Sequence, residues 1–132
     1  PGDIQVAVPQ CPDLAPALGA MAALRRGTTR FVGAGRLRIK ESDRLSAIVA
    51  TIRALGGEAE EVGDSLLVRG VEQLRGGGTV DSWNDHRIAM MAAILATRCQ
   101  APVRLTAMEC VDKSYPDFWK HFAALGGKYH VV

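Results

Sequence analysis

The sequence predicts an α/β protein in which strands alternate with helices. Short runs of β-branched residues alternate with segments whose apolar residues recur at helical spacing. Hydrophobic residues make up 48% of the chain and aromatic residues only 5%, so small aliphatic side chains must fill the core, as helices packed on a sheet require. Leu-Gly-Gly follows two of the predicted helices, at 55–57 and 125–127, which suggests an internal repeat. Helical crossovers between strands favour parallel pairing.

The first expected elements are two strands with a helix between them. Residues 4–8 read as a strand that ends at Pro9. Asp13 is well placed to cap the following helix, and Arg-Arg-Gly at 25–27 gives that helix a typical ending. Residues 28–32 then read as the second strand, followed by a loose bend.

A second helix and a hairpin follow. The helix has one apolar face, and Gly56-Gly57 ends it. Segments 58–62 and 65–69 are joined by Gly63-Asp64, which is typical of a hairpin turn. The apolar face consists of Leu45, Ile48, Val49, Ile52 and Leu55.

The remaining chain begins with a flexible glycine run at 76–78 and a short strand at 79–82. The third helix, 88–96, is apolar nearly all round, so we expect it to be buried on every side. A strand at 102–106 and a loop carrying Lys113 precede a fourth helix. That helix presents Phe118, Phe122 and Leu125 at helical spacing.

Length and charge limit the class of protein. With 132 residues we expect one partial domain spanning 1–132, belonging to a longer protein. Sixteen basic and fourteen acidic residues almost cancel, which argues against a nucleic-acid binder. The apolar run 88–96 is shorter than the roughly 20 residues that span a bilayer. We therefore expect a soluble, cytoplasmic protein without a membrane or nucleic-acid partner.

The cysteines do not suggest a metal site or a catalytic thiol. Cys11, Cys99 and Cys110 form no CxxC pair and no zinc-binding spacing with the three histidines. We expect reduced, structural thiols.

Charge is concentrated in the segment Arg-Ile-Lys-Glu-Ser-Asp-Arg-Leu, residues 38–45, where a strand-like run gives way to the second helix. Basic residues at a helix N-terminus are repelled by the dipole unless an anion lies among them. Lys40 and Arg44 are therefore candidate ligands for phosphate or carboxylate. The alternative is a solvated helix start with Ser42 or Asp43 as the N-cap.

A second cluster, Asn-Asp-His-Arg-Ile-Ala-Met at 84–90, repeats this arrangement at the third helix. If the units stack in parallel, the helix N-termini gather at one end of the domain and form one anionic site. The residues expected there are Asp13, Lys40, Glu41, Arg44, His86, Arg87 and Lys113.

The carboxylates suggest proton transfer in addition to anion binding. Asp13 would accept a proton from a hydroxyl or hold a ring through its hydroxyls, and Glu41 would exchange protons with a reacting atom. Four of the candidate site residues also have a plainer interpretation. Asp13 would be only an N-cap, His86 would bond the preceding loop, Arg87 would form a surface salt bridge, and Lys113 would be an ordinary loop lysine.

The two motifs, the sequence Lys-Ser-Tyr-Pro-Asp-Phe at 113–118 and Pro12-Asp13 together closely resemble the 5-enolpyruvylshikimate-3-phosphate synthases. Order and spacing match across essentially the whole chain, which corresponds to the C-terminal third or so of a family member. The resemblance implies transfer of an enolpyruvyl group from phosphoenolpyruvate to the 5-hydroxyl of shikimate 3-phosphate, with release of phosphate. It implies no metal or organic cofactor. It also implies an inside-out α/β barrel fold of two lobes, each built from repeated βαβαββ units with buried helices.

The resemblance also implies roles for individual residues. Asp13 matches the proton acceptor that contacts the shikimate ring, and Glu41 a second proton-transfer group. Lys40 matches a ligand of the shikimate phosphate. The residues that match phosphoenolpyruvate ligands are Arg44, Arg87 and Lys113, and His86 lies beside them as a further catalytic candidate.

The family's other lobe supplies further contacts, so we expect the isolated chain to have little or no turnover and to need the N-terminal part of the same enzyme as its partner. Two other functions stay open. One is the sister enolpyruvyl transferase that acts on UDP-N-acetylglucosamine, against which the motif at 40–44 argues. The other is a non-catalytic module that binds a phosphorylated partner.

Overall fold

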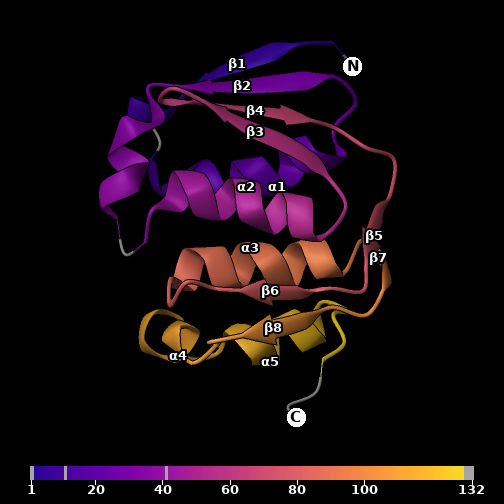
Figure 1. Cartoon of the computed structure of the whole chain (residues 1–132). Helices are drawn as coiled ribbons and strands as arrows, with labels where there is room; N and C mark the ends of the chain where they lie inside the picture. Colours follow the sequence, from indigo (N-terminus) through magenta and orange to yellow (C-terminus); the bar gives the residue numbers. More distant parts are fainter. Residues whose placement is uncertain (1, 11, 41, 130–132) are drawn as a thin grey trace.

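The computed structural model describes residues 2–10, 12–40 and 42–129. Its first half is one complete βαβαββ unit, as the sequence predicted (Figure 1). In chain order the unit consists of β1 (Ile4–Ala7), α1 (Ala15–Leu24), β2 (Thr28–Val32), α2 (Arg44–Ala54), β3 (Glu58–Val62) and β4 (Ser65–Arg69).

The four strands form one mixed sheet in the order β1-β2-β4-β3. β1 and β2 are parallel, with Ile4 opposite Thr29, because α1 crosses between them. β3 and β4 form the predicted hairpin, with Val62 opposite Ser65, and β4 also pairs antiparallel with β2. The sheet therefore combines the parallel pairing of a crossover with an antiparallel hairpin.

The second half contains two small parallel sheets, β5 with β7 and β6 with β8, and α3 connects β6 to β7 in the chain. Two short helices follow and lie beneath β8 in Figure 1. The elements are β5 (Leu74–Gly76), β6 (Thr79–Asp81), α3 (His86–Ala96), β7 (Cys99–Ala101), β8 (Arg104–Thr106), α4 (Cys110–Ser114) and α5 (Phe118–Ala124).

Three predictions of irregular structure were wrong. The bend after β2 is a 3₁₀ helix, Ala34–Ile39, so the charged motif at 38–45 begins in a helical turn and not in a strand. The glycine run is not a free connection, because Gly76 ends β5 and pairs with Ala101. Lys113 lies in α4 instead of a loop. At Gly76, pairing with a strand distant in the chain decided the local structure.

The core lies in layers between the sheet and the helices. The largest cluster of buried side chains joins the sheet to α1, α2 and α3, and includes the whole apolar face predicted for α2. A smaller cluster joins Ala89 and Ala93 of α3 to Val111 and Phe118. Helix α3 thus lies between two cores, but the prediction that it is buried on every side was wrong, because Ile94 is 51% exposed. Leu125, predicted to lie on the apolar face of the last helix, is 90% exposed.

Small residues let the central helices approach closely. A Cβ at Gly19 of α1 would lie 3.1 Å from Ile48 Cγ2 and 3.8 Å from Met91 Cε, so a larger side chain would push α1 away from α2 and α3. This close contact brings the starts of the three helices toward the same end of the molecule (Figure 1).

The two Leu-Gly-Gly sequences end their helices with the same backbone geometry. Leu55 and Leu125 are the C-cap residues of α2 and α5, and the glycine after each has a positive φ, +94° and +104°. The second glycine donates its N–H to an equivalent carbonyl, at 2.8 Å from Gly57 N to Ile52 O and at 2.9 Å from Gly127 N to Phe122 O. This is the geometry of a Schellman ending.

Two features of the described residues bear on the class of protein. No helix among them is long and apolar enough to cross a membrane. Cys99 and Cys110 are free thiols, and burial raises the pKa of both, which disfavours the reactive thiolate. Cys11 lies outside the described residues.

Candidate functional site

The site begins with the way the sequence starts α2. Asp43 is the N-cap, and its carboxylate accepts the N–H of Ser46 at 3.2 Å. This confirms one of the two plain expectations for the motif and excludes Ser42 as the cap. The next residue, Arg44, is the first of the helix and is only 1% exposed. A buried guanidinium at a helix N-terminus needs anionic partners, because both burial and the helix dipole oppose its charge.

The other arginine of the motif serves a different purpose. Arg38 lies in the last turn of the 3₁₀ helix and donates to Asp43 at 3.0 Å and to Glu61 of the β3–β4 hairpin at 2.7 Å. The hydrogen bonds from Arg38 to Glu61 and then Asp43 are the main reasons that its pKa is raised. Arg38 therefore ties the charged segment to the hairpin.

Asp85 is the principal described partner of Arg44. Its carboxylate accepts Arg44 Nε at 2.8 Å and Nη2 at 3.2 Å, a bidentate contact between two fully buried side chains. It also accepts the hydroxyl of Ser42 at 2.8 Å and the backbone N–H of Arg87 at 3.0 Å. Removing one member of such a buried pair typically costs about 3–5 kcal/mol, because the other charge is left uncompensated.

Asp85 stays ionised in this setting. Burial acts to raise its pKa, but the hydrogen bonds from Arg44 and Ser42, the charge of Arg44 and the N–H of Arg87 outweigh burial. The net effect is to hold the pKa of the Asp85 carboxyl below its ordinary value of 3.8.

A tight turn places Asp85 at the start of α3. Trp83 and Asn84 both have positive φ, +59° and +53°, which is uncommon for residues with side chains. Ser82 supports this conformation, since its hydroxyl accepts Asn84 N–H at 3.1 Å and donates to Ala107 O at 2.6 Å. The chain reverses within this turn, so the N-cap Asp85 points toward α2.

Asp13 completes the connection between the three helix starts. It lies in a one-turn 3₁₀ helix, Pro12–Leu14, and is not the cap of α1, whose N-cap is Leu14 without a side-chain bond. The Asp13 carboxylate, 60% exposed, accepts Arg44 Nη1 at 3.3 Å and lies 4.0 Å from Arg87 Nη2. Arg87 Nη1 also donates to the Asp13 carbonyl at 3.2 Å.

The structure therefore brings Asp13, Arg44 and Arg87 together, as predicted, and gathers the N-termini of α1, α2 and α3. Each is held by an element far from the others in sequence. The arrangement is an exposed carboxylate between two guanidinium groups, one buried and one partly exposed. It suits the binding of an anion beside a proton acceptor.

The other predicted residues are less closely connected. Lys40 is exposed and His86 is partly buried, and the side chain of neither has a hydrogen bond or ion pair with another described residue. The loop contact considered for His86 is thus not formed. Glu41 lies outside the described residues, and of Lys113 the structure places only the backbone, in α4.

Sequence reasoning considered Ser42 only as a possible N-cap and assigned no role to Asp85 in the site. A signal was present, because an aspartate one residue before a helix with a basic first turn is a good N-cap. Nothing in the sequence indicated that its carboxylate would also reach Arg44, 41 residues away.

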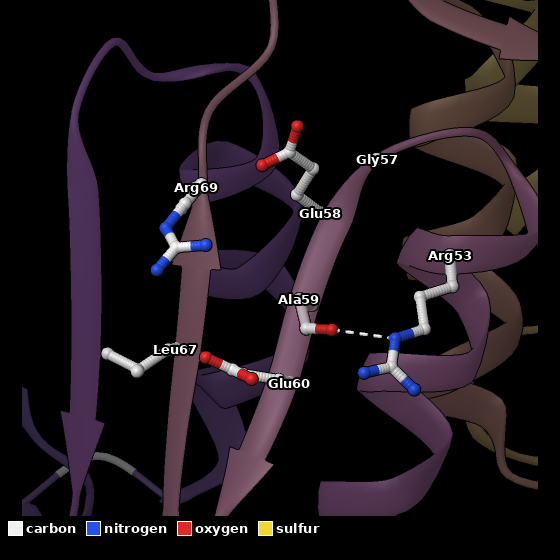
Figure 2. Close-up of a pocket in the computed structure, with 7 residues that line it drawn as sticks. All are labelled: Arg53, Gly57, Glu58, Ala59, Glu60, Leu67 and Arg69. Carbon is white, nitrogen blue, oxygen red and sulfur yellow. Dashed lines mark hydrogen bonds between the residues drawn. The ribbon is translucent and has the colours of Figure 1, made fainter.

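A pocket of about 300 Å³ lies elsewhere, over the hairpin and the end of α2 (Figure 2). Arg53 and Arg69 line it together with Glu58 and Glu60, so its charges oppose one another. Arg53 Nε already donates to the carbonyl of Ala59 at 2.7 Å, which braces α2 against β3. This pocket gathers no predicted residue, and the helix starts remain the candidate site. Among the described residues, no group of three or more His, Cys, Asp or Glu side chains is placed to hold a metal ion.

Comparison with known proteins agrees with the motifs. The profile of EPSP synthase (3-phosphoshikimate 1-carboxyvinyltransferase) matches residues 3–122. The chain belongs to the EPSP synthase family. The match includes every predicted site residue from Asp13 to Lys113.

Individual relatives agree with this assignment. The 3-phosphoshikimate 1-carboxyvinyltransferase of Clostridium acetobutylicum is 54% identical over 121 residues, which are 92% of this chain and 28% of that protein. The relative of the same name in Clostridioides difficile is 52% identical over 119 residues, 90% of this chain and 27% of the relative. This chain therefore spans little more than a quarter of the length of these relatives.

A solved structure extends the comparison to the fold. EPSP synthase from Acinetobacter baumannii superposes with a TM-score of 0.85 at 30% identity, over 92% of this chain and 28% of that one. The fold of this chain is thus that of the enolpyruvyl transferases, with mixed α/β units and buried helices, as the resemblance implied.

Proposed function

We propose that this chain supplies one wall of the substrate site of an enzyme that transfers the enolpyruvyl group of phosphoenolpyruvate to the 5-hydroxyl of shikimate 3-phosphate, releasing phosphate. One observation carries the proposal. The Asp13 carboxylate lies between the guanidinium groups of Arg44 and Arg87, so a proton acceptor stands beside two cations that suit a carboxylate or phosphate. Family membership supplies the identity of the substrates.

In the proposed reaction, Arg44, Arg87 and Lys113 hold phosphoenolpyruvate, and Lys40 holds the phosphate of shikimate 3-phosphate. The 5-hydroxyl oxygen bonds to C2 of phosphoenolpyruvate while its proton passes to Asp13 and the methylene carbon gains a proton. Loss of phosphate and of one methyl proton then restores the double bond. Glu41 and His86 are the candidates for the proton transfers at carbon.

The guanidinium groups contribute by orientation and charge. Fixed cations on the carboxylate and phosphate hold the reacting atoms together and favour the negative charge that develops as phosphate leaves. Because Arg44 is already held by Asp85, its position needs little reorganisation when substrate binds.

We further propose that residues 1–132 form a single partial domain, and that the remaining contacts come from another part of the same enzyme. The chain covers 28% of the Clostridium acetobutylicum relative, which leaves most of that protein to supply them. The isolated chain is then expected to show little or no turnover. The cytoplasmic location expected from the sequence remains a prediction.

A chimera tests this function directly. Its sequence is that of the Clostridium acetobutylicum relative with the matching segment replaced by this chain. We expect phosphate release that depends on both phosphoenolpyruvate and shikimate 3-phosphate, within about tenfold of the parent rate, since the segments are 54% identical. The isolated chain serves as the control without the rest of the enzyme.

Three results would contradict the proposal. Turnover by the isolated chain near that of the parent would show that no further lobe is needed. Binding of UDP-N-acetylglucosamine in place of shikimate 3-phosphate by the chimera, measured by isothermal titration, would favour the sister transferase. Phosphate binding without any turnover in the chimera would favour a binding module.

A further inference from the structure

Asp85 holds a central place in the site without facing substrate. Its side chain is fully buried, and its two oxygens contact groups from both helix starts. One oxygen accepts Arg44 Nε and the Ser42 hydroxyl, and the other accepts Arg44 Nη2 and the N–H of Arg87. One carboxylate therefore joins the first residue of α2 to the first turn of α3.

The geometry of the contact decides which edge of Arg44 faces outward. Asp85 takes the edge formed by Nε and Nη2, and Nη1 then points to the exposed carboxylate of Asp13. A bidentate contact fixes the plane of a guanidinium group as well as its position. The same aspartate fixes the start of the helix that carries Arg87, whose side chain reaches Asp13 from the other side.

Stability alone does not account for this arrangement. A buried ion pair is often no more stabilising than apolar residues of the same volume, because both charges must be desolvated. Three bonds from one carboxylate to the α2 start and one to the α3 start are better suited to setting the relative position of two cations than to holding a core together.

We propose that Asp85, assisted by Ser42, is the positioning residue that presents Nη1 of Arg44 to a substrate anion and sets the spacing between Arg44 and Arg87. The inference rests on the proposed function, because phosphoenolpyruvate is the anion that this spacing would fit. Asp85 acts through Arg44 and Arg87 and does not itself contact the substrate.

The test uses Asp85→Asn in the chimera described above, with kcat and KM measured separately for each substrate. Asparagine keeps the shape but loses the charge and one acceptor. We expect KM for phosphoenolpyruvate to rise about tenfold to a hundredfold, as for loss of a charge-assisted hydrogen bond, and KM for shikimate 3-phosphate to change less than about threefold. Ser42→Ala keeps the ion pair and should give a rise of about twofold to tenfold in the same constant.

Asp81→Asn is the matched control. Asp81 precedes the same turn and its carboxylate also accepts a backbone N–H, that of Trp83 at 2.9 Å, but it forms no ion pair with another described residue. We expect its KM values to match those of the parent chimera. A purely structural role for Asp85 predicts a different pattern, in which kcat falls with the folded fraction while KM for phosphoenolpyruvate stays unchanged. That pattern would overturn the proposal, and if Asp85→Asn does not fold, Ser42→Ala decides by the same criterion.

Failure of the proposed function is distinguishable from failure of this inference. If the parent chimera has no activity, isothermal titration of the 132-residue chain with phosphoenolpyruvate decides. Binding at least about tenfold weaker in Asp85→Asn than in the parent supports positioning. Equal affinity in the two proteins, or no binding by the parent chain, overturns it.

Discussion

Asp13 occupies the position between the two arginines that a substrate anion would need. Its carboxylate lies 3.3 Å from Arg44 Nη1 and 4.0 Å from Arg87 Nη2. Replacing Asp13 with asparagine removes the competing negative charge and, in the proposed reaction, the proton acceptor. The variant should therefore bind anions more tightly and yet turn over more slowly.

The size of the first effect follows from the geometry. The Asp13 side chain is 60% exposed, so solvent screens both ion pairs and each is worth on the order of 0.2–1 kcal/mol. Releasing both arginines leaves about 0.4–2 kcal/mol for an incoming anion, or about twofold to thirtyfold tighter binding. Loss of a positioned general base lowers kcat by about 10²-fold to 10⁴-fold.

Two assays measure the two effects. Isothermal titration of the chain with phosphoenolpyruvate gives the affinity, and phosphate release by the chimera gives kcat. Glu60→Gln on the hairpin is the control for loss of one negative charge, since Glu60 is exposed and is not among the predicted site residues. Weaker anion binding in Asp13→Asn would show that Asp13 organises the arginines instead of competing for them, and an unchanged kcat would refute its role as proton acceptor.

Three further predictions concern stability, each measured by urea unfolding of the 132-residue chain. The pKa of Asp85 is lowered in the folded state, so its contribution to stability is present above the ordinary value of 3.8 and is lost as pH falls through the folded pKa. The free energy of unfolding should therefore drop below about pH 4, and it should drop less in Asp85→Asn. Equal acid sensitivity of the two proteins would contradict this. Leu66→Ala, at a fully buried strand position, should cost about 2–5 kcal/mol, whereas Leu125→Ala, 90% exposed, should change stability by less than about 0.5 kcal/mol. Gly56→Ala and Gly126→Ala should each cost about 1–2 kcal/mol of stability, because both positions have a positive φ. Gly56→Ala should cost about 1–3 kcal/mol more, because its Cβ would lie 3.0 Å from Arg75 Cβ, whereas a Cβ at Gly126 meets no atom within 4 Å. Equal losses at the two glycines would refute the contact.

Several elements of the fold were readable from local sequence because local chemistry decides them. The hairpin at 58–69 follows from two β runs around Gly63-Asp64, and β2 was predicted at the bounds observed, Thr28–Val32. The apolar face of α2 predicted its buried residues, and the nearly uniform apolar character of α3 predicted its extensive burial, although Ile94 is exposed.

Other elements depend on partners distant in the chain. Gly76 became part of a strand because Ala101 lies beside it, and the residues after β2 formed a 3₁₀ helix although their glycines suggested a loose bend. Asp13 looked like an N-cap because its type and position fit one, yet the helix begins two residues later and its carboxylate turns to Arg44. Such choices depend on which groups lie nearby after folding.

For this protein, the sequence by itself determined the α/β class and the order of elements in the βαβαββ unit, since periodicity, caps and turns are local properties of the chain. The catalytic and binding roles of the motif residues stay a prediction. Only the tertiary structure decided which partner each charged side chain of the motif at 38–45 binds. Arg38 is directed to the hairpin and Arg44 to the buried carboxylate of Asp85, because a buried guanidinium must find its anion in three dimensions, and here that anion lies 41 residues away.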